Sequence, residues 1–200
     1  MADRYDSFVT LAANEIEGVD YRIRMTERAS SIAIIAPHGG LIETGSSEIA
    51  GAIAADRFSL YCFEGLIQAN SARLHITSSR FDEPRALALV SAAEVAIGVH
   101  GRKDRGDEAS IWVGGLHESL RDAICEALTS AGFKAKPVGD GHRLAGRDPA
   151  NICNRGRCGA GVQLELPKTL RDALVREVSG RAALAAAVRD ALERTAPPLA

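Results

Sequence analysis

Two histidines and a glutamate stand where buried strands should end, and together they could bind a metal ion. His38 and His100 each come at the end of a short apolar run. Such runs are typical of central strands in open α/β sheets, which place their ligands at the carboxyl ends of the strands. Gly39-Gly40 allows a turn that returns Glu43 toward His38. Two imidazoles and one carboxylate leave one position of a tetrahedral zinc ion open, so we predict a catalytic zinc site formed by His38, Glu43 and His100.

A second carboxylate, Glu165, lies near the end of another strand-like segment. Residues 162–167 alternate between apolar and polar side chains and close with a proline. A zinc hydrolase needs a carboxylate that takes the proton of the metal-bound water and hands it to the leaving amine. Glu165 could supply it if its side chain faces the metal. Alternation alone leaves a solvent-facing position equally open.

The remaining histidines have simpler interpretations. His75 lies inside a strand pattern and is expected to be a hydrogen-bonded strand residue, not a ligand. His117 falls in the first turn of a predicted helix. His142 belongs to the Gly-, Asp- and Arg-rich loop 140–149, which could overhang a site and offer a substrate or proton contact, although an ordinary surface histidine is the simpler interpretation.

These residues need a sheet to bring them together, and the sequence pattern predicts one. The strand over residues 21–26 alternates in polarity and should be antiparallel and near the sheet edge, and Pro37 should end the strand before His38. The fold class is therefore α/β, with an open, mixed, mostly parallel sheet flanked by helices. Strands are predicted over residues 21–26, 32–36, 60–63, 74–77, 95–99 and 162–167, and helices over residues 6–18, 44–56, 82–93, 116–131 and from 169 onward.

Composition limits the classes of partner. The 200 residues suit one domain, which we place at residues 1–200. With 24 Lys and Arg against 26 Asp and Glu, the net charge of -2 gives no basic surface for nucleic acid and no polybasic membrane signal. No apolar run approaches the roughly 18 residues that a membrane span needs. We expect neither nucleic acid nor membrane as a partner.

The cysteines and the N-terminal residues indicate the cellular compartment in which the protein is expected. The four cysteines lack the regular spacing of a disulfide scaffold, and Cys153 and Cys158 are expected to be mostly free thiols. The sequence from residue 1 to 6 shows no secretory signal. These features predict a cytoplasmic protein, or one released by lysis if its gene derives from a phage.

Several motifs, in order along nearly the whole chain, resemble the phage-type poly-γ-glutamate hydrolase family. They are His-Gly-Gly-Leu-Ile-Glu at 38–43, the segment 76–84, Val-His-Gly at 99–101, and the segments 151–156 and 161–166. That family is similar in fold to zinc carboxypeptidases. Arg80 departs from the pattern, in which a histidine is common before Phe-Asp. The resemblance implies one zinc ion on the two histidines and the glutamate named above, with Glu165 as general base.

The resemblance also implies a substrate-binding pair, Asn154 and Arg155. A γ-glutamyl chain carries a free α-carboxylate on every residue, and the planar fork of an arginine suits such a group. Arg102 and Arg157 also lie beside the predicted site segments. Of these arginines, Arg155 has the best claim, and Arg102 is kept as a substrate-binding candidate.

Three functions fit these residues. The leading hypothesis is a zinc-dependent hydrolase that cleaves γ-glutamyl amide bonds in poly-γ-glutamate. The second is a zinc carboxypeptidase or amidase acting on small peptides, cell-wall fragments or N-acyl amino acids, since its catalytic set would look the same. The third is a binding module of the same fold without turnover, and the retention of a complete set of ligands and base argues against it.

Overall fold

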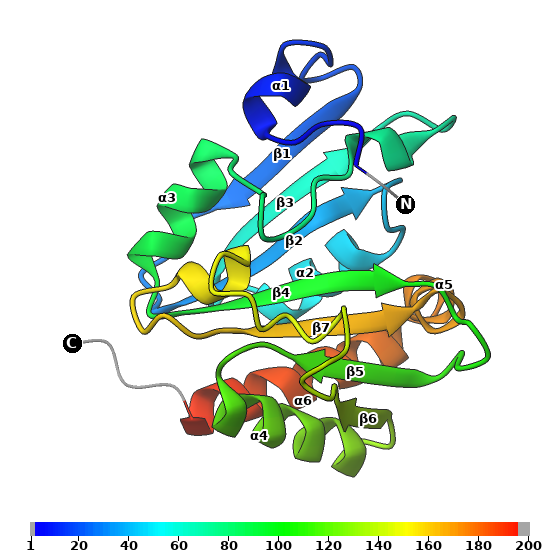
Figure 1. Cartoon of the computed structure of the whole chain (residues 1–200). Helices are drawn as coiled ribbons and strands as arrows, with labels where there is room; N and C mark the ends of the chain where they lie inside the picture. Colours follow the sequence, from blue (N-terminus) through cyan, green and yellow to red (C-terminus); the bar gives the residue numbers. More distant parts are fainter. Residues whose placement is uncertain (1–2, 196–200) are drawn as a thin grey trace.

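The computed structural model describes residues 3–195, which form an α/β fold around a seven-stranded sheet (Figure 1). The strands lie in the order β1-β3-β2-β4-β7-β5-β6. Strands β3, β2, β4 and β7 are mutually parallel, whereas β1 is antiparallel to β3 and β5 is antiparallel to β7. The predicted mixed, mostly parallel sheet with an antiparallel edge strand is confirmed. The strands are β1 (Tyr21–Thr26), β2 (Ile32–Gly40), β3 (Ser59–Gly65), β4 (Val95–Arg102), β5 (Ser110–Gly114), β6 (Lys134–Pro137) and β7 (Val162–Pro167).

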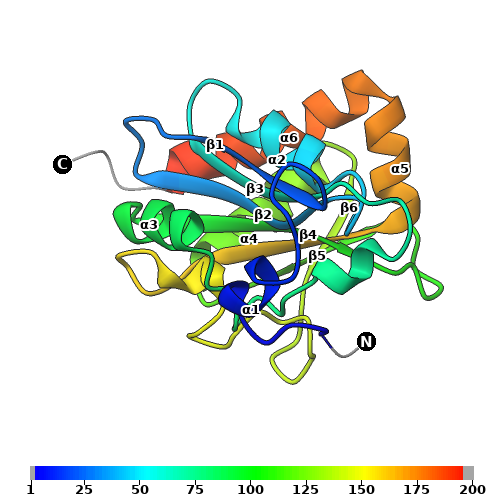
Figure 2. The same ribbon diagram turned by 90° about the horizontal axis from the view of Figure 1, so that it is seen from above.

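Helices cover both faces of the sheet. Helices α2, α4, α5 and α6 pack on one face, and α1 and α3 pack on the other. Seen from above, α2, α5 and α6 lie on one side of the sheet and α1 on the opposite side (Figure 2). None of the helices within residues 3–195 combines the length and the apolar character needed to cross a bilayer. The helices are α1 (Phe8–Ala12), α2 (Ser46–Ala54), α3 (Pro84–Ala92), α4 (Glu118–Ser130), α5 (Lys168–Arg176) and α6 (Val178–Thr195), with short 3-10 helices η1 (Ser71–Leu74) and η2 (Ile152–Arg155).

The central strands are apolar throughout because each of their faces is buried. In β2, Ile34 packs in the cluster under α2, α4 and α6, while its neighbour Ile35 packs in the cluster under α3. Both side chains are fully buried. Side chains of a strand alternate between the faces, so a strand with helices on both sides needs apolar residues at every position. The four cysteines are unpaired, as predicted for Cys153 and Cys158.

The predicted end of β2 at Pro37 is wrong. The strand continues to Gly40. Ala36 and Gly39, three residues apart, pair with residues of β3 that are only two apart, so β2 contains one extra residue at this point. Proline cannot donate to the ladder, and a bulge accommodates it without ending the strand. This bulge includes His38.

The predicted strand over residues 74–77 is also wrong, and two real strands were not predicted. Both neighbouring positions of β3 are already filled by β1 and β2, so the segment after η1 finds no strand to pair with and runs extended toward the site. Strand β5 has five residues and β6 has four, with mostly polar or exposed side chains in β6. Segments this short and polar carry little periodic signal.

Replacing Ile34 by alanine should lower the free energy of unfolding by about 2–5 kcal/mol, because truncating a fully buried side chain leaves a cavity. The matched change Ile16→Ala, at a side chain that is 62% exposed, should alter it by less than about 0.5 kcal/mol. Urea denaturation of both variants measures the difference. Equal losses would contradict the place of Ile34 in the core.

Candidate functional site

The bulge in β2 turns His38 toward the site. By regular alternation, His38 would share the face of Ile34, under α2. One extra residue reverses the side chains that follow it. The His38 ring instead stacks on His75, with centroids 4.0 Å apart, and meets the edge of Phe81, which belongs to the cluster on the opposite face. His100 projects from the same face, because its neighbour in β4, residue 99, belongs to the α2-side cluster.

The turn after β2 brings Glu43 back to His38. The Glu43 N–H donates to the His38 carbonyl at 3.0 Å, and the Ser46 hydroxyl donates to the Glu43 carbonyl at 2.7 Å. Gly40 has φ +59, and a Cβ there would lie 2.5 Å from the carbonyl oxygen of Gly65. Only glycine fits this position, so the Gly-Gly pair is what permits the return of the carboxylate.

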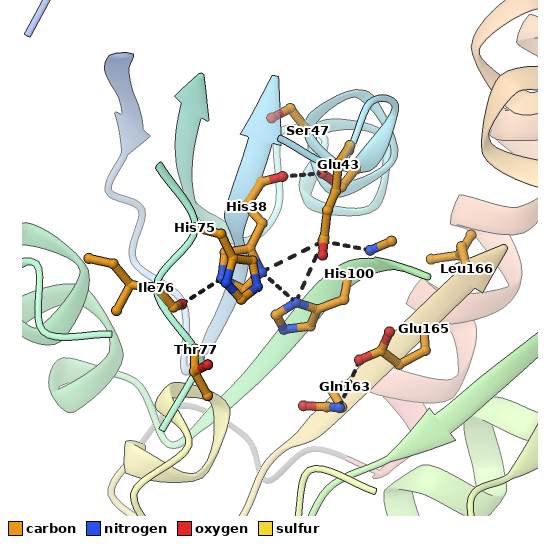
Figure 3. Close-up of polar contacts among 12 residues, drawn as sticks. His38, Glu43, Ser47, His75, Ile76, Thr77, His100, Gln163, Glu165 and Leu166 are labelled. Atoms are coloured by element: carbon orange, nitrogen blue, oxygen red, sulfur yellow. Dashed lines mark hydrogen bonds and ion pairs between the residues drawn. The ribbon is translucent and has the colours of Figure 1, made fainter. Parts of the chain in front are cut away.

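Three potential ligand atoms converge at this point (Figure 3). Nδ1 of His38 lies 3.2 Å from Nδ1 of His100, and Oε2 of Glu43 lies 3.6 Å and 3.8 Å from these two nitrogens. Ligand atoms at about 2.0–2.2 Å from a tetrahedral zinc ion lie about 3.3–3.6 Å from one another. The geometry therefore fits one zinc ion with an open fourth position.

Hydrogen bonds orient these ligand atoms. Nε2 of His38 lies 2.8 Å from the carbonyl oxygen of Ile76, and a carbonyl only accepts, so Nε2 carries a proton and Nδ1 is the nitrogen that faces Glu43 and His100. Oε2 of Glu43 accepts the Gly101 N–H at 2.7 Å. A metal-binding histidine ordinarily donates its other N–H to a backbone or carboxylate oxygen in this way. Nε2 of His100 is buried without a partner among the described residues.

The charge states also suit a metal. Burial opposes ionisation of Glu43, but the two histidines and the Gly101 N–H hold its pKa at about 2. Burial, reinforced by His38, lowers the pKa of His100 to about 3. The ionised Glu43 and the neutral His100 are in the state in which these groups bind metals. Burial opposes a charge on His38, but Glu43 raises its pKa, so His38 would release a proton when a metal binds.

Glu165 faces the same space and not the solvent. In the parallel pairing of β4 and β7, Glu165 stands beside His100, so both side chains project from one face of the sheet. Glu165 is 4% exposed, and its Oε1 accepts a hydrogen bond from Nε2 of Gln163 at 3.1 Å (Figure 3). Burial and the nearby Glu43 raise its pKa well above the ordinary value, whereas the charges of Arg102 and Arg143 lower it.

His75 is closer to the site than its sequence pattern indicated. Ligand atoms of His38, Glu43 and His75 also lie within 4.8 Å of one another, so His75 is a second candidate for the third ligand. The His75 and His38 rings are stacked with only 25° between their planes. Imidazole lone pairs lie in the ring plane, so nearly parallel stacked rings do not converge on one ion. We therefore favour His100 as the third ligand.

Arg102 lines the cavity, but backbone carbonyls occupy its guanidinium. Its NH1 and NH2 donate to the carbonyls of residues 103, 104, 107 and 110 at 2.7–3.1 Å. The group also lies 4.1 Å from the ring centroid of Trp112. In this structure, Arg102 holds the loop between β4 and β5, and its contact with substrate stays a prediction.

Asn154 and Arg155 are not among the described residues that line the cavity. The Asn154 amide accepts from the N–H groups of residues 116 and 161 and donates to the carbonyls of residues 146 and 148. Arg155 donates to the Ser79 carbonyl at 3.4 Å. The structure thus gives Asn154 a backbone-organising role, and substrate binding by this pair also stays a prediction.

The cavity itself has a volume of about 600 Å³ and a basic rim that the sequence did not reveal. Besides the three predicted ligand residues and Glu165, it is lined by Lys103, Arg105 and Arg143, whose side chains form no ion pair among residues 3–195. The loop 140–149 does overhang the site, as predicted, and contributes Arg143 and His142. These cations lie in loops, where no periodic pattern marks the direction of a side chain.

An open α/β sheet with such a centre at the carboxyl ends of its parallel strands is a zinc carboxypeptidase-like fold. A solved N-formylglutamate amidohydrolase from Ralstonia eutropha JMP134 shares this fold alone, with a TM-score of 0.56 and 13% identity over 88% of this chain and 98% of that one. The sequence model of one protein family, described as poly-gamma-glutamate hydrolase, matches residues 5–191 of this chain. The chain belongs to that family.

Three other proteins are more similar to this chain. The solved bacteriophage poly-gamma-glutamate hydrolase has a TM-score of 0.90 and 34% identity, covering 96% of this chain and 98% of that one. A solved zinc-free apo form of YndL has a TM-score of 0.92 and 32% identity, covering 98% and 100%. The SPbeta prophage-derived UPF0714 protein YoqZ of Bacillus subtilis (strain 168) is 39% identical over 165 residues, which are 82% of this chain and 59% of YoqZ. This chain therefore spans less than two thirds of YoqZ.

His100→Ala should lose both bound zinc and activity, because it removes one of three converging ligand atoms. His117→Ala is the matched control, since that residue caps α4 and does not line the cavity, and it should keep about one zinc ion per chain. Elemental analysis of both purified variants measures the metal. A His100→Ala variant that retains parental zinc would refute the assigned ligand set.

Proposed function

We propose that the protein is a zinc-dependent hydrolase that cleaves γ-glutamyl amide bonds in poly-γ-glutamate. The observation that carries the proposal is the convergence of His38, Glu43 and His100 beside Glu165 in one cavity of a poly-gamma-glutamate hydrolase family member. Zinc bound there would supply a Lewis acid for the scissile carbonyl and a water of lowered pKa.

In this proposal Glu165 moves the proton. Its Oε1 is held by Gln163, so Oε2 is the oxygen that accepts the proton of the attacking water and later returns it to the leaving amine. Burial brings the carboxyl pKa upward, toward the range in which a group can both take and give a proton near neutral pH. A cation at the ligand set would favour the ionised carboxylate that must begin the cycle.

The basic rim favours a polyanionic substrate. Lys103, Arg105 and Arg143 are unpaired within the described chain and line the cavity that holds the ligand set. A γ-linked glutamate polymer presents an α-carboxylate on every residue, and charge-assisted hydrogen bonds from these side chains would hold it in register. We propose that Arg143, which lies near enough to Glu165 to lower its pKa, is the main carboxylate ligand, with Arg155 as the residue that the resemblance assigns.

The second candidate is an amidase or carboxypeptidase acting on small peptides, cell-wall fragments or N-acyl amino acids. The same ligand set and base would serve that reaction, so only the cavity distinguishes the two functions. A small substrate with a single carboxylate would engage only part of a rim with three unpaired cations, whereas a γ-linked polymer offers a carboxylate on every residue. A binding module without turnover would in turn have no use for a buried carboxylate beside the ligand set, since burying an unpaired acid costs stability.

Glu165→Gln should slow turnover by roughly 10²–10⁴-fold, the usual contribution of general acid–base catalysis, because the amide cannot accept a proton. Zinc content should stay near the parental value. Glu43→Gln should instead lose zinc, because it replaces a ligand. Steady-state kinetics and elemental analysis separate the two roles, and parental turnover in Glu165→Gln would leave Glu165 without a catalytic role.

The protein should shorten γ-linked polyglutamate and leave α-linked polyglutamate intact in a digest followed by size-exclusion analysis. Arg143→Ala should raise KM for the γ-linked polymer by about tenfold or more, as expected for the loss of one charge-assisted contact. Lys134→Ala, an exposed cation on β6 away from the cavity, is the control and should leave KM unchanged. Cleavage of the α-linked polymer alone would overturn the proposed substrate.

A further inference from the structure

A buried carboxylate from the first residues of the chain reaches the edge of the site. The side chain of Asp3 is only 3% exposed. Its oxygens accept from Nδ1 of His75 at 2.7 Å, the N–H of Thr77 at 2.7 Å and the guanidinium of Arg80 at 2.6 Å. The partners lie more than 70 positions away along the chain. Nothing in the mechanism above uses Asp3, His75 or Arg80.

This network fixes the tautomer of His75. The Thr77 N–H and the Arg80 guanidinium donate to Oδ2 of Asp3, and His75 contacts its Oδ1. Burial raises the pKa of Asp3, but the hydrogen bonds from Thr77 and His75 hold it at about 2, so Asp3 is an ionised acceptor and Nδ1 of His75 is the donor to it. Nε2 of the neutral ring is then left with a lone pair. No hydrogen-bond partner for Nε2 occurs among the described residues. A partner-free acceptor is available for a ligand.

His75 also lies where a substrate must pass. Its side chain is 33% exposed and lines the cavity of about 600 Å³ together with Glu165. It lines in addition a second cavity of about 250 Å³, which Glu43, Lys103 and Arg171 share. Glu43 and His75 line both cavities, so His75 stands at their junction. Figure 3 shows His75 beside His38, one of the three predicted ligand residues.

We propose that Nε2 of His75 accepts a hydrogen bond from an amide N–H of the substrate chain at the centre of the site, and that Asp3 is the positioning residue that holds His75 for this contact. The inference rests on the proposed amide hydrolysis and adds a substrate contact to it. The carboxylates of the polymer are recognised by the basic rim, but its amides need acceptors, and His75 supplies one beside the ligand set. The stacking of His75 on His38 keeps its ring from the metal and aligned with the cavity.

Asp3→Ala tests this proposal, and the N-terminal segment that carries residue 3 should stay in place in this variant. The same segment is held by Tyr5, whose hydroxyl donates to Glu15 at 2.5 Å, and by the N–H of Phe8, which donates to Asp82 at 2.5 Å. In Asp3→Ala the turnover number on γ-linked polymer should fall by about 10–100-fold, the usual cost of removing a partner that orients a site imidazole, while KM and zinc content stay near parental. Tyr5→Phe removes the Tyr5–Glu15 hydrogen bond from the same segment and leaves the Glu15–Arg73 ion pair beside His75 in place, so it should keep the parental turnover number.

The tautomer of His75 gives a readout that does not depend on activity. Two-dimensional ¹⁵N NMR of the imidazoles in the metal-free protein should show the proton of His75 on Nδ1 in the parent and a shift toward Nε2 in Asp3→Ala. Parental turnover together with an unchanged tautomer in Asp3→Ala would overturn the positioning role. Loss of zinc in His75→Ala would overturn the substrate contact, because it would make His75 a ligand. A parent that fails to cleave the polymer would refute the proposed function, whatever the NMR result.

Discussion

One extra residue in β2 is the constraint on which the site depends. The parallel pairing of β4 with β7 places His100 beside Glu165 on one face of the sheet. Regular pairing would leave His38 on the other face, in the core under α2. The bulge at Pro37 reverses His38, and the Gly-Gly turn that follows returns Glu43 to the same point. A ligand set taken from distant parts of the chain thus follows from one local irregularity in an otherwise regular sheet.

The surroundings of the two buried carboxyl groups, Glu43 and Glu165, set their charge states and so the chemistry that suits each. A buried carboxylate is costly unless it is paired, and Glu43 is paired with two imidazoles and one backbone N–H. Glu165, one strand further on, has only an amide partner among residues 3–195, so burial raises its pKa and does not leave it strongly acidic. The pKa of Glu43 is therefore lowered and the pKa of Glu165 is raised. A low pKa suits Glu43 to bind a cation, and a raised pKa suits Glu165 to exchange a proton.

Much of this could be predicted from the sequence, because apolar runs and glycine turns reveal central strands and their ends. The sheet class and the predicted ligand residues follow from those signals. Alternation alone left the direction of Glu165 open, and the pairing of β7 with β4 shows which face its side chain takes. The direction of His38 does not, since Pro37 looks like a strand end and only the pairing with β3 shows a bulge. Arg143 and Asp3 lie in segments without periodicity, and their partners are set by tertiary contacts. The contacts of Arg102 could not be predicted either. An arginine beside a site looks the same in sequence whether it binds a substrate or four backbone carbonyls.

We propose that His38, Glu43 and His100 share one zinc ion, and anomalous diffraction from a zinc-soaked crystal would locate that ion. Data collected on both sides of the zinc absorption edge locate the metal independently of any assay. The account predicts one peak per chain at about 2.0–2.2 Å from Nδ1 of His38, Nδ1 of His100 and Oε2 of Glu43, the ordinary ligand distances of zinc. A peak bonded to His75 in place of His100, or no peak at this point, would contradict it.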